Sequence, residues 1–309
     1  MRRRPHSPRA DAVETIEIHT ADGVSLRATV RDAVSHTRER GTAILAHAEF
    51  TSRIEFENAA GRGLAPYLAS RGWRTVAFDF RGHGESRPAQ TAADAKAGSV
   101  DYTYDDLVRG DLAAVASCAR ARWSGPLVVV GHALGGHAAL AGCGTSTVDA
   151  DAIAAIASNV WLPQFEPSVL RWHAKQAAME FLAAVVQARG HAPGRAMGLG
   201  TEDESASMVN AAVRAVREGM WHSEDGTLDY ERALGQVKVP VLAVASASDR
   251  LRCAPDCAER MLARCGGPRD FRLIARDDDG GPAPRHMDLI KGRRSSNVWE
   301  TIADWLESI

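Results

Sequence analysis

The stretch VVVGHALGG, residues 128–136, is the most informative part of the sequence. An apolar strand, Pro126–Gly131, is expected to run directly into a helix, Leu134–Ala141, through a turn with glycines at its first and fifth positions. Small residues are needed there because the turn is sharp and packs closely on its neighbours. Such a turn presents its central residue at a helix N-terminus, where the next backbone N–H can stabilise an oxyanion. The central residue here is Ala133, which has no hydroxyl.

Strand-like and helix-like runs alternate on both sides of this stretch, which indicates an α/β protein with a mostly parallel sheet. Two strands are expected around the turn Ala21-Asp22-Gly23, because Asp-Gly is a strong hairpin signal. The further expected strands are Thr42–His47, Trp73–Phe80, Pro126–Gly131, Ile153–Ser158, Val239–Ala247 and Phe271–Ala275. The expected helices are Asn58–Arg71, Tyr104–Arg122, Leu134–Ala141, Ser168–Arg189, Ser205–Met220 and Ser296–Glu307.

The alternation stops between residues 162 and 237, which contain no convincing strand and read as a helical cap. Insertions in parallel sheets usually lie at the carboxyl ends of the strands, where ligands bind. We therefore expect a flexible basic arm over residues 1–12, a core over residues 13–161 and 238–309, and a cap between them.

The composition is that of an ordinary globular protein, with 309 residues, 45% apolar and 25% charged. The net charge of −2 argues against a dedicated nucleic-acid binder. No apolar run is long enough to span a membrane, and none follows the basic start as in a secretory signal. Five cysteines without framework spacing favour reduced thiols, no metal site and a cytoplasmic location.

Several ordered motifs resemble those of the α/β-hydrolase superfamily, and more closely of predicted bacterial α/β hydrolases with an esterase/lipase-like core. The central turn has the form of the nucleophile elbow, G-x-S-x-G, with Ala133 in place of the serine. The stretch DFRGHGES, residues 79–86, is similar to the family's D-x-R-G-x-G-x-S. The opening Thr20–Gly23, the cap segment Gly198–Leu199–Gly200, and an Asp followed by a late His complete the set, so the resemblance spans most of the chain.

The resemblance implies a catalytic set in which Ala133 stands at the nucleophile position, Asp249 is the acid and His286 is the base. The chain order of the three positions is the order found in this fold. The oxyanion hole would use the backbone N–H of Leu134 and a second N–H from the loop at Glu49 and Phe50.

The oxyanion loop departs from the family pattern at two positions. The family often has His-Gly where this chain has His47-Ala48, which is a mild change. The next residue, Glu49, would place a negative charge beside a developing anion unless its side chain points outward.

Three interpretations of Ala133 stay open: an engineered serine knockout, a natural non-catalytic protein that binds an apolar ligand or a protein partner, and an enzyme in which His286 directs a water molecule. Loss of the serine of a comparable triad costs on the order of 10⁶ in kcat, so ordinary esterase turnover is not expected. The parent chemistry would be hydrolysis of small apolar esters without a cofactor, and the oligomeric state is left open. The expected pocket residues are His47, His132, Trp161, Trp172 and Trp221.

Overall fold

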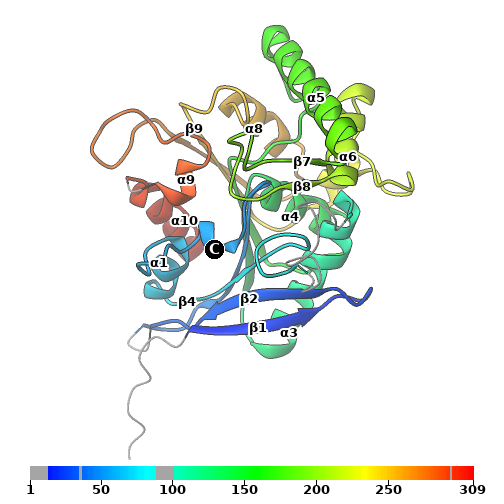
Figure 1. Cartoon of the computed structure of the whole chain (residues 1–309). Coiled ribbons are helices and arrows are strands. Elements are labelled where there is room, and N and C mark those ends of the chain that lie inside the picture. Colours follow the sequence, from blue (N-terminus) through cyan, green and yellow to red (C-terminus); the bar gives the residue numbers. More distant parts are fainter. Residues whose placement is uncertain (1–12, 35–36, 88–100, 293) are drawn as a thin grey trace, which may run out of the picture.

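A computed structural model describes residues 13–34, 37–87, 101–292 and 294–309. Its main element is an eight-stranded sheet with the order β1-β2-β4-β3-β5-β6-β9-β10 (Figure 1). The first two strands pair antiparallel with each other, β2 pairs antiparallel with β4, and all later neighbours are parallel. The strands are β1 (Val13–His19), β2 (Ser25–Arg31), β3 (Gly41–Ala46), β4 (Trp73–Phe78), β5 (Leu127–His132), β6 (Ala152–Ile156), β9 (Val241–Ser246) and β10 (Arg269–Ile274).

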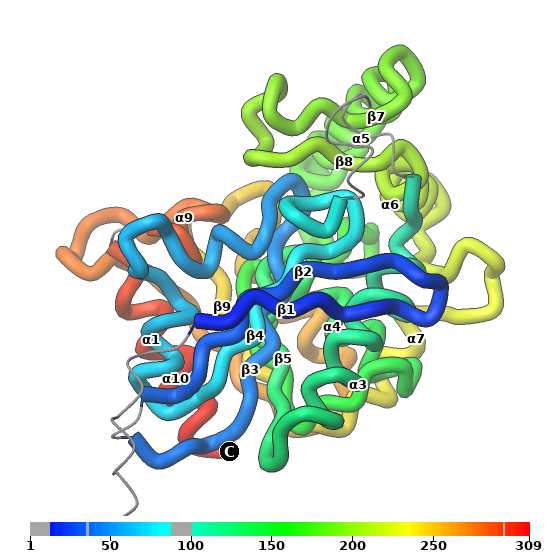
Figure 2. The backbone as a smooth tube through the Cα atoms, turned by 60° about the horizontal axis from the view of Figure 1, so that its bottom comes forward, coloured from blue at the N-terminus to red at the C-terminus, as the bar shows by residue number. Residues whose placement is uncertain are grey.

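The central strands are buried on both faces, as continuous apolar runs in a parallel sheet require. In β3, Ile44 faces one apolar cluster whereas Ala43 and Leu45 face the other. One layer of helices contains α3 (Ala113–Arg122) and α4 (Leu134–Gly144), and the opposite layer contains α1 (Leu64–Ser70) and α10 (Ser296–Ser308). Figure 2 shows these two layers on either side of the sheet.

Two long helices, α5 (Val169–Arg189) and α6 (Ala206–Glu218), lie in the segment between β6 and β9, and they stand beyond one end of the sheet (Figure 1). Each begins at a serine, Ser168 or Ser205, whose side chain accepts a hydrogen bond from a backbone N–H of the first turn. Each ends at a left-handed glycine. The two helices pack together over a small apolar cluster that includes Phe50 from the core.

The remaining helices are shorter: α7 (Tyr230–Ala233), α8 (Pro255–Leu262), α9 (Asp288–Lys291), the 3₁₀ helices η1 (Arg53–Glu55) and η3 (Leu234–Gln236), and the π-helix η2 (Asp106–Leu112). No helix in the described ranges is long and apolar enough to cross a membrane.

The predicted strands and most predicted helices are confirmed, and three details differ from the expectation. The helix expected over Asn58–Arg71 begins only at Leu64, because Gly61 and Gly63 adopt positive φ values that end a helix. The predicted cap contains a two-stranded pairing, β7 (His191–Ala192) with β8 (Glu204–Ser205), whose strands are too short to give a periodic signal. The first half of the helix expected over residues 104–122 is the π-helix η2. The predicted basic arm, residues 1–12, lies outside the described residues.

Candidate functional site

The turn between β5 and α4 holds Ala133 in a strained conformation, with φ 45° and ψ −106°. Non-glycine residues rarely adopt a positive φ, and strain of this kind persists only where the surroundings impose it. The Ala133 N–H donates to the carbonyl of Ile156, and the Gly135 N–H donates to the carbonyl of His47. A Cβ on Gly135 would lie 2.1 Å from the Ala46 oxygen. Hydrogen bonds and close packing therefore hold the turn against β6 and β3, the two neighbours of β5.

Asp249 and His286 come together at the carboxyl end of β9. The Asp249 Oδ2 atom lies 2.5 Å from Nδ1 of His286, and Oδ1 accepts from the Cys253 N–H at 3.1 Å. Burial alone would raise the pKa of Asp249, but the hydrogen bond and charge of His286, the Cys253 N–H and the Arg252 charge together outweigh it and lower that pKa. Burial also lowers the pKa of His286, although the bond to Asp249 opposes it. At neutral pH the pair is a carboxylate and a neutral imidazole, and the Nε2 atom of that imidazole has no hydrogen-bond partner in the described part of the chain.

His132 lies directly behind His286. Its Nε2 atom is 3.2 Å from the His286 carbonyl oxygen, and its Nδ1 atom is 3.3 Å from both carboxylate oxygens of Glu55. Glu55 also accepts from the Ala48 N–H at 3.0 Å. The buried Glu55 carboxylate therefore contacts both the loop after β3 and His132, the residue that contacts the His286 backbone.

His47 links the same loop to the segment after β4. Its Nδ1 atom lies 2.8 Å from the Ala48 carbonyl oxygen, and its Nε2 atom lies 3.0 Å from the Phe80 nitrogen. Burial lowers the pKa of His47 well below its usual range, so the ring is neutral and can donate at Nδ1 while it accepts at Nε2. Both His47 and His132 are fully buried behind the cavity wall, because their ring nitrogens satisfy backbone and carboxylate groups there.

Three residues that line the larger cavity beside Ala133 have a backbone N–H available as a donor. Within the described residues, the N–H groups of Glu49, Phe50 and Leu134 have no backbone acceptor, and all three residues line the cavity. The Phe50 carbonyl accepts from Thr201 and Glu202, which ties this loop to the cap. A carbonyl oxygen bound between these donors would be stabilised as it gains negative charge.

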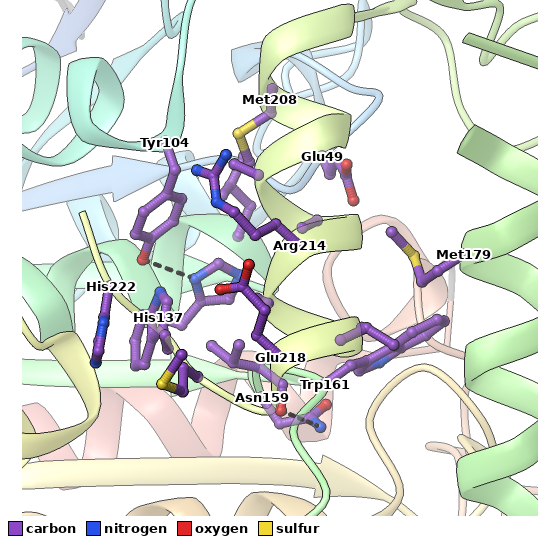
Figure 3. Close-up of a pocket in the computed structure, with 18 of the residues that line it drawn as sticks. Glu49, Tyr104, His137, Asn159, Trp161, Met179, Met208, Arg214, Glu218 and His222 are labelled. Atoms are coloured by element: carbon purple, nitrogen blue, oxygen red, sulfur yellow. Dashed lines mark hydrogen bonds between the residues drawn. The ribbon is translucent and has the colours of Figure 1, made fainter. Parts of the chain in front are cut away.

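Two adjoining cavities lie between the sheet end and the two long helices. The larger, about 430 Å³, is lined by Ala133, His286 and apolar side chains of α5 and residues 197–199. The smaller, about 180 Å³, extends along α6 toward Trp221. Both share a wall that contains Glu49 and His137. In Figure 3, His137 lies beside Tyr104, whose hydroxyl is 3.0 Å from its Nδ1 atom.

The predicted tryptophans occupy different places. Trp161 lines both cavities, and its indole N–H donates to the Arg252 carbonyl at 2.8 Å. Trp221 lines the smaller cavity. Trp172 instead packs in the apolar cluster between α5 and α6 and is not among the lining residues.

Two residues that line the cavities were not predicted from the sequence. Asn159 lines both cavities, and its buried Oδ1 atom has no partner in the described residues. His137 is half-buried, and loss of solvent around its ring lowers its pKa to about 3, so it is a neutral hydrogen-bonding group. Neither carries a motif, and only the fold brings them to the cavity. No cluster of three or more His, Cys, Asp or Glu side chains suited to a metal ion occurs within the described ranges.

A sheet of this order, with the Ala133 turn after its central strand and an Asp–His pair at its carboxyl end, defines an α/β hydrolase. The sequence from residue 58 to 276 matches the family described as serine aminopeptidase, S33. The chain belongs to this family. A search of curated proteins gave no significant match.

Solved structures with the same fold include several esterases. A thermophilic esterase from Thermogutta terrifontis is 17% identical, with a TM-score of 0.61 over 96% of this chain and 98% of that one. Est1E from Butyrivibrio proteoclasticus, solved with ferulic acid bound, is 14% identical, with a TM-score of 0.62 over 95% and 98%. The esterase domain of a Rhodothermus marinus protein is 17% identical, with a TM-score of 0.58 over 96% and 98%. At these identities the likeness establishes the fold.

Proposed function

We propose that the larger cavity binds a small ester with an apolar acyl group, and that Ala133 stands at the nucleophile position, so that no acyl-enzyme forms. The observation that carries this proposal is the Asp249–His286 pair, which shares one cavity with Ala133 and three free backbone N–H groups. These are the parts of an acyl-transfer site apart from the attacking oxygen.

The strained backbone at Ala133 supports the same assignment. A left-handed alanine has no conformational advantage of its own, yet the surrounding strands hold it at φ 45°. A serine in that conformation would present its hydroxyl to the cavity that His286 lines. The apolar cap residues on the opposite wall, including Met179, Leu182 and Met197, favour an aliphatic or aromatic acyl group.

A second candidate function is hydrolysis by a water molecule that His286 directs onto the bound ester. The free Nε2 atom of His286 favours it, because a neutral imidazole can take a proton from water as well as from serine. A non-catalytic ligand-binding role is the third outcome. The cytoplasmic location remains a prediction.

The test is hydrolysis of short- and medium-chain p-nitrophenyl esters by the unaltered chain, by Ala133→Ser and by Ala133→Ser/His286→Ala. We expect turnover with Ala133→Ser only. Turnover by the unaltered chain that His286→Ala abolishes would instead establish the water-directed reaction. If Ala133→Ser hydrolyses no ester, the ester assignment is wrong.

A further inference from the structure

Glu49 is the one residue of the oxyanion loop whose side chain conflicts with the proposed chemistry. It is half-buried and lines both cavities, so the carboxyl does not point outward into solvent (Figure 3). An ionised carboxylate at this place would repel the negative charge that an ester carbonyl gains during attack. Either the position disables the site or the carboxyl is neutral when the site works.

The surroundings of Glu49 favour the neutral carboxyl. Burial raises the pKa of Glu49 to about 8, and the nearby Glu204 carboxylate adds to the effect, while Arg252 and His83 oppose it. Among the residues that the structure describes, no neighbouring group donates a hydrogen bond to the ionised form of Glu49. The titratable or charged groups near Glu49 come from several elements. The core supplies His83, Tyr102, His137, Arg252 and His286, and the cap supplies Glu204, Arg214, Glu218 and His222.

The Glu204 carboxylate interacts with other side chains of the protein. Its carboxylate accepts a hydrogen bond from the Tyr102 hydroxyl and lies 3.4 Å from Nε2 of His83. Glu204 and His83 are both fully buried. Because these partners bind Glu204 and not Glu49, the Glu49 carboxyl keeps its donor and acceptor capacity for a ligand in the cavity.

We propose that the Glu49 carboxyl, in its neutral form, donates a hydrogen bond to the carbonyl oxygen of the bound acyl group, and so adds a side-chain donor to the backbone N–H groups of the oxyanion hole. This inference rests on the proposed function, since it needs an acyl carbonyl beside Ala133. It also sets a pH window. The donor is present below about pH 8 and is replaced by a repelling charge above it.

The first test uses the pH dependence of kcat/KM for ester hydrolysis by Ala133→Ser. We expect a fall at acid pH as His286 becomes protonated, and a second fall above about pH 8 as Glu49 ionises. Ala133→Ser/Glu49→Gln should lose the alkaline fall, because an amide donates at every pH. Ala133→Ser/Glu49→Ala should lower kcat/KM by about 10²-fold, the usual loss for one oxyanion donor. The control Ala133→Ser/Glu300→Gln, which changes an exposed carboxyl of α10 that lines neither cavity, should keep the alkaline fall.

An alkaline fall that persists unchanged in Ala133→Ser/Glu49→Gln would overturn the role of Glu49. The second test needs no turnover and measures binding of octan-2-one, a ketone that cannot be hydrolysed, to the unaltered chain by calorimetry. We expect tighter binding at pH 7 than well above pH 8, and no such difference in Glu49→Gln. Binding that is independent of pH would contradict the Glu49 donor alone. No binding, together with an inactive Ala133→Ser, would contradict the proposed function itself.

Discussion

The Nε2 atom of His132 lies 3.2 Å from the backbone carbonyl oxygen of His286, while its Nδ1 atom faces the Glu55 carboxylate. Both partners are hydrogen-bond acceptors, and the His132 ring lies between them with one nitrogen toward each. His132 therefore acts as a positioning residue for His286 from a fully buried place. A buried carboxylate such as Glu55 needs this partner, because an unpaired buried charge is strongly unfavourable.

Replacing His132 should impair ester hydrolysis by Ala133→Ser without direct contact to the substrate. We expect Ala133→Ser/His132→Ala to lower kcat by about 10²-fold, the scale associated with a small misplacement of a catalytic group. KM should change little, because His132 does not line either cavity. The matched control is Ala133→Ser/His173→Ala, with the second change on the exposed face of α5, which should leave both constants of Ala133→Ser unchanged. Equal kcat values for the two variants would contradict the positioning role.

The close contact between the Ala133 turn and β3 predicts a position-specific effect of glycine replacement. Gly135→Ala places a Cβ 2.1 Å from the Ala46 carbonyl oxygen, so the helix or the strand must move. We expect a loss of unfolding free energy of about 3 kcal/mol or more. Gly235→Ala is the matched control, because no atom lies within 4 Å of its added Cβ. The check is the urea midpoint of each variant, and similar midpoints would show that the turn is not tightly packed.

A buried ion pair joins α5 to the segment that precedes it. Lys175 is fully buried, its Nζ atom lies 2.8 Å from Oε2 of Glu166, and the Cys257 thiol lies 3.2 Å from the same carboxylate oxygen. Burial would raise the pKa of Glu166, but hydrogen bonds from Arg171 and Lys175 outweigh it and lower that pKa to about 2. The carboxylate is therefore ionised throughout the neutral range.

Replacing Lys175 with an apolar residue removes one of the cationic partners of the buried Glu166 carboxylate. We expect Lys175→Met to lower the free energy of unfolding by about 3–5 kcal/mol. The exposed pair of Arg217 with Glu180 gives the comparison, since Arg217→Met should cost about 1 kcal/mol or less. Urea unfolding at neutral pH measures both, and a small effect of Lys175→Met would contradict the buried pair.

The smaller cavity predicts how acyl-chain length affects turnover. Ala212 on α6 lines the smaller cavity but not the larger one, so Ala212→Trp should fill the smaller cavity and spare the Asp249–His286 pair. In the Ala133→Ser background we expect p-nitrophenyl acetate hydrolysis to be retained. Octanoate hydrolysis should fall by about tenfold or more, because several methylenes lose their apolar contacts. An equal loss for both esters would mean that the smaller cavity does not bind the acyl chain.

The strand–turn–helix around Ala133 and the parallel sheet could be predicted because both depend on local patterns. Apolar runs identify buried strands, and a sharp turn demands glycines. The late positions of Asp249 and His286 were expected only through the family resemblance, and the structure brings them into contact.

Other features depend on contacts between distant residues. Lys175 is fully buried with Glu166, and Arg171 binds Glu166 and Asp256. Periodicity cannot reveal a partner that the fold supplies from another segment. The sequence also left open that the Glu49 side chain points outward. It does not, because the cap, a distant part of the chain, covers the loop that carries Glu49.

The most direct test of the central assignment is covalent labelling by a fluorophosphonate, followed by intact-mass measurement. A phosphonate reacts only with an activated nucleophile in a formed oxyanion site. Ala133→Ser should gain a single adduct at residue 133, Ala133→Ser/His286→Ala should gain almost none, and the unaltered chain should gain none. An Ala133→Ser chain that stays folded but unlabelled, or an adduct on the unaltered chain, would contradict the placement of the nucleophile position at Ala133.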